Sequence, residues 1–263
     1  MIKPKRARRA SNPAPKLAER DGSAAPLLRM EGVHTHIGRY HILHGVDLAV
    51  PEGEVTMLLG RNGAGKTTTL RTLLGLWRAS AGRVRFGDAD ITRLATPEIA
   101  RLGCAYVPED MGIFGTLTVR ENLILAARSG APDPERLRWV FGLFPPLERF
   151  WTLPAGVLSG GQKQMLAIAR ALIEPRRLLL IDEPSKGLAP AVVQQLIQVF
   201  RELKAARTTI LMVEQNLALA QAVGDRVAVM VDGRIVHSSA MAELAADPAT
   251  QARLLGFSLE PPA

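Results

Sequence analysis

The chain has 263 residues, of which 47% are hydrophobic and 22% charged, a balance that excludes a disordered chain and suits one large or two small globular units. No apolar run approaches the roughly 18 residues that span a bilayer, and the first 25 residues lack the apolar centre of a secretory signal, so we expect a soluble protein that is not exported. The single cysteine, Cys104, excludes an internal disulfide; it opens an apolar run, which favours a buried strand residue over a nucleophile and fits a reducing cytoplasm.

The N-terminal segment is strongly basic. Residues 1–25 hold seven basic and two acidic side chains, a net charge of +5 within the total of +8, so the body of the chain is ordinary in charge. Because the segment is rich in Pro, Ala and Arg and poor in large apolar groups, we predict that residues 1–26 form a disordered tail. A solvated extension is the plain interpretation, and contact with anionic lipid headgroups or with nucleic acid is the alternative.

Alternating apolar and polar residues begin directly after this tail. Residues 28–33 and 45–50 show the period-two pattern of half-buried strands, and residues 51–54 are typical of a turn. Residues 55–59 form a short apolar run, which indicates a buried strand. These segments predict β structure over the first part of the folded chain.

A glycine-rich segment follows the buried strand. Residues 60–68 have the sequence GRNGAGKTT and match the pattern G-x-x-x-x-G-K-[ST] of a phosphate-binding loop. Glycines let backbone N–H groups point at a phosphate, and the helix that begins near Gly65 adds the positive end of its dipole. Lys66 would reach the β- and γ-phosphates, and the Thr67 hydroxyl would hold Mg²⁺. The candidate nucleotide-binding residues of this loop are Gly60, Arg61, Asn62, Gly63, Ala64, Gly65, Lys66, Thr67 and Thr68.

The helix after the loop has an apolar stripe that would pack on the sheet. Its members are Leu70, Leu73, Leu74 and Trp77. Residues 79–82 are expected to end the helix, and residues 83–86 to form a strand. Between about residue 110 and residue 157 the composition shifts to helix formers interrupted by prolines. We therefore predict an inserted helical subdomain there, with helices at residues 119–128 and 134–143.

The pentapeptide Leu158-Ser159-Gly160-Gly161-Gln162 is a more specific signal than the loop. A hydroxyl, two glycines and an amide that open a helix make a second anion site, because bare N–H groups and a helix dipole point at the ligand. The candidate residues are Ser159, Gly160, Gly161 and Gln162. One chain thus carries two half-sites for a triphosphate.

Helices and apolar strands alternate over the rest of the chain. The expected helices are residues 162–173 and 191–205, and the expected strands are residues 178–181, 208–213 and 226–231. This alternation indicates a mostly parallel sheet that is covered on both faces. One stripe at helical spacing is assigned to the core, and its members are Val193, Leu196, Ile197, Phe200 and Leu203.

Two acids end the apolar strand at residues 178–181. Successive side chains of a strand point to opposite faces, so Asp182 and Glu183 can have different roles. Asp182 would bind Mg²⁺, and Glu183 would polarise the water that attacks the γ-phosphate. An ordinary strand-to-loop junction is the alternative, and the phosphate loop upstream argues against it.

Together the phosphate loop, the pentapeptide and the paired acids resemble the ABC transporter ATPase family, over residues 27–257. The resemblance implies a P-loop NTPase fold of the ABC type: an α/β domain with a mostly parallel sheet covered by helices, an antiparallel β subdomain and the inserted helical subdomain. It also implies that the pentapeptide completes the phosphate loop of a second subunit, and that residues 185–190 cross to that partner's site. Residues 258–263 would be a short C-terminal tail.

Further residues take their interpretation from the same resemblance. Tyr40 is similar to the aromatic residue that stacks on adenine, although a tyrosine before a strand is also a plain surface residue. Glu109 and Gln215 stand where most members of the family have glutamine and a switch histidine. With Asn122, they resemble the ATP-binding subunits of branched-chain amino acid importers, and urea importers are the nearest alternative. Gln215 is expected to hydrogen-bond the γ-phosphate without carrying charge; its alternative role is to cap the strand end.

The resemblance therefore predicts an ATPase, with ATP and Mg²⁺ bound, on the cytoplasmic face of the inner membrane. Its partners would be separate permease subunits, a second ABC ATPase subunit, identical or different, and indirectly a periplasmic binding protein. Nucleic acid is not expected as a partner: soluble nucleic-acid-associated ABC ATPases usually carry two cassettes or a long coiled-coil insertion, and this chain has neither. P-loop kinases and GTPases lack the pentapeptide at residues 158–162.

Overall fold

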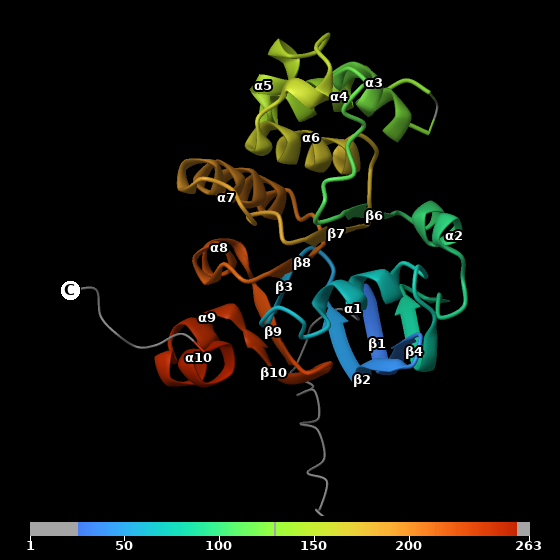
Figure 1. Cartoon of the computed structure of the whole chain (residues 1–263), viewed down its shortest axis with the longest axis vertical. Coiled ribbons are helices and arrows are strands. Elements are labelled where there is room, and N and C mark those ends of the chain that lie inside the picture. The colour runs from blue at the N-terminus through green and yellow to red at the C-terminus, as the bar shows by residue number, and fades with distance from the viewer. Residues whose placement is uncertain (1–25, 129, 257–263) are drawn as a thin grey trace, which may run out of the picture.

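The computed structural model describes residues 26–128 and 130–256 of the chain (Figure 1). The predicted N-terminal tail, apart from Pro26, and the predicted C-terminal tail lie outside the described residues. No helix in these two stretches is both long enough and apolar enough to cross a membrane.

A six-stranded sheet forms the centre of the molecule, and its strand order is β10-β9-β3-β8-β7-β6. The pairs from β9 to β6 are parallel, and β10 runs antiparallel to β9, which confirms the predicted mostly parallel sheet. The strands are β3 (Val55–Leu59), β6 (Cys104–Val107), β7 (Leu178–Asp182), β8 (Ile210–Glu214), β9 (Arg226–Val231) and β10 (Arg234–Ala240).

A second, antiparallel sheet has the strand order β2-β1-β4-β5. It consists of β1 (Leu28–Ile37), β2 (Tyr40–Val50), β4 (Ala79–Phe86) and β5 (Ala89–Asp90). The predicted strands at residues 28–33 and 45–50 were too short, because irregularities in register between Met30 and His36 interrupt the alternation on which the prediction rests. The assignment of residues 79–82 as a helix end was wrong, since they begin β4. There Gly82 approaches β1 closely: a Cβ atom on Gly82 would lie 2.3 Å from the Gly32 carbonyl oxygen.

The helices lie mainly on one side of the parallel sheet and in an insertion at the top of Figure 1. They are α1 (Lys66–Leu73), α2 (Thr96–Arg101), α3 (Val119–Ala126), α4 (Pro134–Leu143), α5 (Pro145–Arg149), α6 (Gly160–Leu172), α7 (Pro190–Ala205), α8 (Leu217–Val223), α9 (Met241–Ala245) and α10 (Pro248–Leu255). The helix at residues 134–143 is confirmed. The helix after the phosphate loop is shorter than predicted, because Gly75 has a left-handed backbone (φ 70°), so Trp77 lies beyond its end.

Alternation along the parallel strands divides the buried side chains between two cores, one on each face. Met57 of β3 faces the helical core, which forms with α3 to α9, whereas Leu58 faces the β core, which forms with the antiparallel sheet and α1. The stripe of α7 is buried in the helical core, as predicted. Cys104 is a buried strand residue of the β core, as predicted, and burial raises the pKa of its thiol to about 12.

The turn between β9 and β10 connects the two sheets to the phosphate loop. Gly233 in this turn has a left-handed backbone (φ 72°); its N–H donates to the Ala64 carbonyl oxygen at 2.8 Å, and its own carbonyl oxygen accepts from His44 N–H at 2.9 Å. A Cβ atom at this position would lie 1.9 Å from the Ile42 carbonyl oxygen. Only glycine therefore fits between the loop and β2.

Gly233→Ala is expected to lower the free energy of unfolding by about 3–5 kcal/mol, because the left-handed backbone and the clash with β2 add. Gly38→Ala is the matched control: its φ is 59° and nothing lies within 4 Å of its Cβ position, so we expect a loss of about 1–2 kcal/mol. Urea unfolding curves measure both. If the two variants lose the same free energy of unfolding, the clash with the Ile42 carbonyl oxygen does not contribute to the loss.

Candidate functional site

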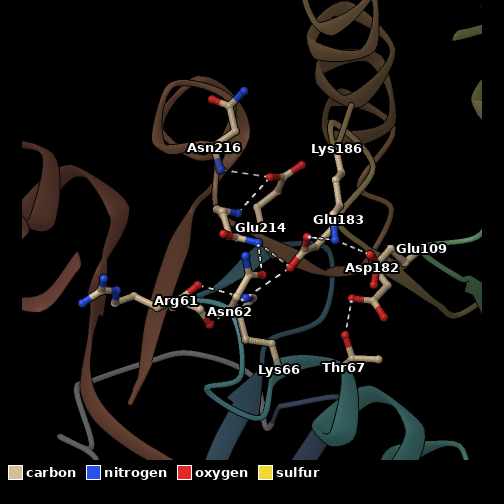
Figure 2. A network of polar contacts seen from close by, with 12 residues as sticks. Arg61, Asn62, Lys66, Thr67, Glu109, Asp182, Glu183, Lys186, Glu214 and Asn216 are labelled. Carbon is tan, nitrogen blue, oxygen red and sulfur yellow. Dashed lines mark hydrogen bonds and ion pairs between the residues drawn. The ribbon is translucent and has the colours of Figure 1, made fainter. Parts of the chain in front are cut away.

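The candidate site lies where three parallel strands end. Leu59 of β3 pairs with Glu214 of β8, and Asp182 of β7 pairs with Val213 of β8, so the carboxyl ends of the three strands share one edge. The phosphate loop follows β3 directly, and α1 begins at its end. Figure 2 shows Glu183 beside Lys66 and Asp182 beside Thr67, at the end of the loop.

The backbone of the phosphate loop is built around its glycines. Gly63 and Gly65 have left-handed backbones (φ 80° and 106°), and Gly65 precedes the first residue of α1. A Cβ atom on Gly60 would lie 2.4 Å from the Met230 carbonyl oxygen, so β9 holds the loop closely. Lys66 folds back over the loop and donates from Nζ to the carbonyl oxygens of Gly60 at 2.9 Å and Arg61 at 3.2 Å.

Glu183 lies at the centre of the polar network, with 7% of its side chain exposed. Its Oε1 is 3.2 Å from Lys66 Nζ and accepts from Gln215 Nε2 at 2.9 Å, while its Oε2 is 3.6 Å from Lys186 Nζ. Its backbone is left-handed (φ 47°), which is costly for a residue with a side chain. This conformation is retained because several contacts fix the carboxylate beside Lys66.

Asp182 and Thr67 form an oxygen-rich pair. Thr67 Oγ1 donates to Asp182 Oδ1 at 3.1 Å, and Tyr106 Oη donates to the other oxygen, Oδ2, at 3.2 Å. Burial raises the pKa of Asp182 despite these hydrogen bonds, and burial next to Asp182 raises the pKa of Tyr106. A carboxylate and a hydroxyl suit Mg²⁺, which takes few protein ligands and completes its shell with water and substrate phosphate.

Two charged residues outside the strand ends enclose the site. Glu109 follows β6, and Lys186 follows Glu183; their side chains form an ion pair. This pair and the neighbouring Glu183 raise the pKa of Lys186. Lys186 therefore links Glu109 to Glu183, because it contacts both carboxylates. Lys186 was not predicted as a site residue.

Gln215 connects the phosphate loop to Glu183. Its Nε2 atom donates to Asn62 Oδ1 at 2.7 Å and to Glu183 Oε1 at 2.9 Å, so both amide hydrogens are used within the site. The Gln215 side chain thus reaches from the end of β8 to Asn62 of the phosphate loop.

Glu214 is a part of the site that the sequence analysis missed. It is 2% exposed and carries no partner of opposite charge in the described chain; instead Oε1 accepts from Ser185 N–H at 3.0 Å, and Oε2 accepts from the N–H groups of Gln215 and Asn216 at 2.9 and 3.0 Å. It fixes the loops after β7 and β8 together. An acid directly after an apolar strand was the available signal, the same one that marks Asp182.

Other predicted residues lie outside this network. Ser159 caps α6: its hydroxyl accepts from Gln162 N–H at 3.3 Å, and the Gln162 side chain accepts from Ser159 N–H at 2.9 Å. This helix is in the upper half of Figure 1, away from α1. Tyr40 is 60% exposed at the start of β2, and its hydroxyl accepts from Arg39 at 3.1 Å. Asn122 is fully buried and bonds the backbone of Phe114, so it supports the loop before α3.

The sequence of this chain is similar to those of known proteins. A family model described as "ABC transporter" matches residues 43–186. The chain is 39% identical over 232 residues to the high-affinity branched-chain amino acid transport ATP-binding protein BraG of Pseudomonas aeruginosa, covering 88% of this chain and 100% of that protein. It is 34% identical over 221 residues to the probable branched-chain amino acid transport ATP-binding protein LivF of Archaeoglobus fulgidus, covering 83% and 94%.

Solved structures of similar proteins share the fold. The ATP-binding cassette MJ1267 of an ABC transporter matches with a TM-score of 0.76 and 27% identity, covering 89% of this chain and 100% of that chain. The dimeric cassette MJ0796, bound to ADP and phosphate after hydrolysis, matches with a TM-score of 0.72 and 26% identity, covering 81% and 98%.

Glu214→Gln is expected to lower the free energy of unfolding by about 1–3 kcal/mol, because the amide NH₂ group cannot accept the buried N–H bonds that one carboxylate oxygen now accepts. The matched control is Glu202→Gln, which changes an exposed carboxylate on α7. Urea unfolding measures both changes. An equal and small effect of the two substitutions would contradict the assigned role of Glu214.

Proposed function

This chain belongs to the ABC transporter family, and from that premise we propose that it is the ATP-hydrolysing subunit of an importer for branched-chain or related amino acids. The observation that carries the cargo class is the similarity to BraG, which extends over the whole length of that protein. The phosphate loop, with Glu183 and Asp182 beside it, supports the ATPase activity. Transport would use separate permease subunits.

Within this proposal the phosphate loop binds the triphosphate of ATP. Lys66, whose Nζ now contacts two loop carbonyl oxygens and Glu183, would turn to the β- and γ-phosphates, since their negative charge outweighs those contacts. Glu183 would then be released from Lys66 and accept a proton from the attacking water. Gln215 would orient that water or donate to the γ-phosphate while it holds Glu183.

Thr67 and Asp182 are the residues that would hold Mg²⁺. When bound, the ion supplies positive charge that stabilises the charge developing on the phosphates. The ionised form of Asp182, which burial disfavours, is the form that a cation would stabilise. Tyr106 and Thr67 orient its two oxygens, so the carboxylate is already positioned.

Two cassettes would form one complete site between them. Ser159, Gly160, Gly161 and Gln162 open α6 away from this chain's own phosphate loop, which supports a role at the loop of a second subunit. The similarity to the dimeric cassette MJ0796 supports the same arrangement. Tyr40, exposed at the start of β2, would stack on adenine. Glu109 with Lys186 would close the side of the site next to the helical insertion.

The cellular setting follows from the same proposal. As a subunit of an importer, the protein would bind permeases at the cytoplasmic face of the membrane, and a periplasmic binding protein would deliver the cargo to them. We further propose that residues 27–257 form the ABC domain, with the helical subdomain at about residues 110–157. Nucleic acid is not part of this function.

Uptake assays test the cargo class. A strain that lacks this chain should lose uptake of labelled leucine, and the wild-type chain should restore it, whereas the Glu183→Gln chain should not. Uptake of labelled urea is the parallel measurement. If urea uptake is lost and leucine uptake is unchanged, the cargo assignment is wrong while the ATPase assignment stands.

Glu183→Gln is expected to reduce ATP hydrolysis by roughly 10²- to 10⁴-fold and to leave ATP binding intact, because the amide keeps the shape and loses the proton-accepting charge. ATP should then hold two cassettes together, as gel filtration with the partner subunit present would show. Glu202→Gln is the control and should hydrolyse ATP at the wild-type rate. Rapid hydrolysis by the Glu183 variant would remove this residue from the mechanism.

Gln215→Ala is expected to lower kcat by roughly ten- to a hundredfold, because it removes two hydrogen bonds in the site, one of them to a carboxylate. The wild-type rate should show no ionisation from this position between pH 5 and 8, since an amide does not titrate there; Gln215→His should retain activity and add a pH dependence. Profiles of kcat against pH for the three proteins measure this. An Ala variant within twofold of wild type would leave Gln215 as a strand-end cap.

A further inference from the structure

A second cavity lies at the edge of the parallel sheet opposite the phosphate loop. Its volume is about 470 Å³, and it is lined by β7, by α4, by the end of α6, by the turn before β3 and by the segments before β7 and β8. Because β7 and β8 run parallel and are five residues long each, this edge is roughly 15 Å from their carboxyl ends. A ligand there would not compete with a nucleotide at the phosphate loop.

The lining of this cavity is strongly basic. It contains Arg136, Arg176, Arg177 and Arg207, and Glu52 is its one carboxylate. Within the described stretches of the chain, no carboxylate lies within ion-pair distance of any of these four guanidinium groups. The residues that line the cavity thus carry a net charge of about +3, and Glu174, outside the lining, offsets part of it at Arg136 and Arg176.

Arg176 is the clearest sign of a missing partner. Its Nε atom is buried and has no hydrogen-bond partner in the part of the chain that the structure describes. Burial lowers its pKa, and the nearby Arg128 lowers it further, while Glu174 acts in the opposite direction. A buried, unpaired guanidinium N–H is costly, and Arg176 has no side-chain acceptor at Nε that a ligand would have to displace.

The Arg136 side chain is fixed in place by two contacts. Its Nε donates to the Leu172 carbonyl oxygen at 2.6 Å, and its guanidinium lies over the Trp139 ring, 4.0 Å from the ring centre. Burial lowers the pKa of Arg136, and repulsion from Arg176 lowers it further. With Nε occupied and the plane fixed, the terminal N–H groups remain to bind an anion, and little side-chain entropy is lost when they do. Arg177 contributes less, because its guanidinium lies over Phe86.

We propose that this cavity is a binding site for a phosphate monoester, held by Arg136, Arg176 and Arg207. A phosphate monoester carries about two negative charges and three acceptor oxygens, which match several convergent guanidinium groups better than a single carboxylate does. Such a ligand would connect α4 of the helical insertion with the sheet edge at residues 206–209. The ester could belong to a soluble metabolite or to a lipid headgroup, since both present the same chemistry.

Titration calorimetry with glycerol 3-phosphate tests the site on the full chain. We expect binding by the wild type, and Arg176→Gln and Arg207→Gln, in two separate segments of the lining, should each weaken it at least tenfold. Arg138→Gln is the matched control, because it removes the same charge from an α4 side chain that is 75% exposed and outside the cavity; its affinity should stay within twofold of wild type. Thermal unfolding confirms that the variants are folded.

Two further arms separate the alternatives. Lys66→Ala should bind glycerol 3-phosphate as the wild type does; if it abolishes binding and the cavity variants do not, the ester occupies the phosphate loop and the proposal is wrong. Co-sedimentation with phosphatidic acid vesicles, and with phosphatidylcholine vesicles as control, tests the lipid source. Binding to either probe that depends on Arg176 and Arg207 supports the site and identifies its source. Binding to neither probe overturns it, and the ATPase assignment is unaffected.

Discussion

The parallel register of β3, β8 and β7 is the constraint on which the site depends. It places Leu59, Glu214 and Asp182 at one sheet edge, so the loop that follows β3 meets the acids that follow the other two strands. Glu214 then fixes the loops after β7 and β8 through backbone hydrogen bonds. Glu183 is forced into a left-handed backbone next to Lys66 as a result. Strand pairing extends to the residue directly before Glu183, since Asp182 pairs with Val213.

Local pattern was sufficient to predict the parallel strands and the longer helices α4, α6 and α7 from the sequence, whereas α2, α5, α8, α9 and α10 were not predicted. Strands that are buried on both faces are apolar throughout, so the runs around Met57 and Leu180 were recognised at once. The fold of the family was likewise predicted. The lengths of the two strands of the antiparallel hairpin were underestimated, because irregularities in their register disturb the period of two. Trp77 was placed in a helix that in fact ends before it, at Gly75.

Contacts between distant segments were beyond local pattern. The motifs placed Lys66, Thr67, Asp182 and Glu183 in one site, but nothing near Lys186 in the sequence indicates its ion pair with Glu109. The contact of Tyr106 with Asp182 depends on β6 pairing with β7, and Gln215 reaches Asn62 only because β8 lies beside β3. The basic cavity is a similar case, since Arg136, Arg176 and Arg207 come from three separate segments with unremarkable composition.

The division of the interior into a helical core and a β core has a consequence for how the sequence can change. The backbone layer of the parallel sheet separates the two, so a side chain of the insertion such as Leu123 shares no packing partner with one of the hairpin such as Val46. Free-energy effects of substitutions that share no partners are additive. The insertion and the hairpin can therefore accumulate substitutions independently.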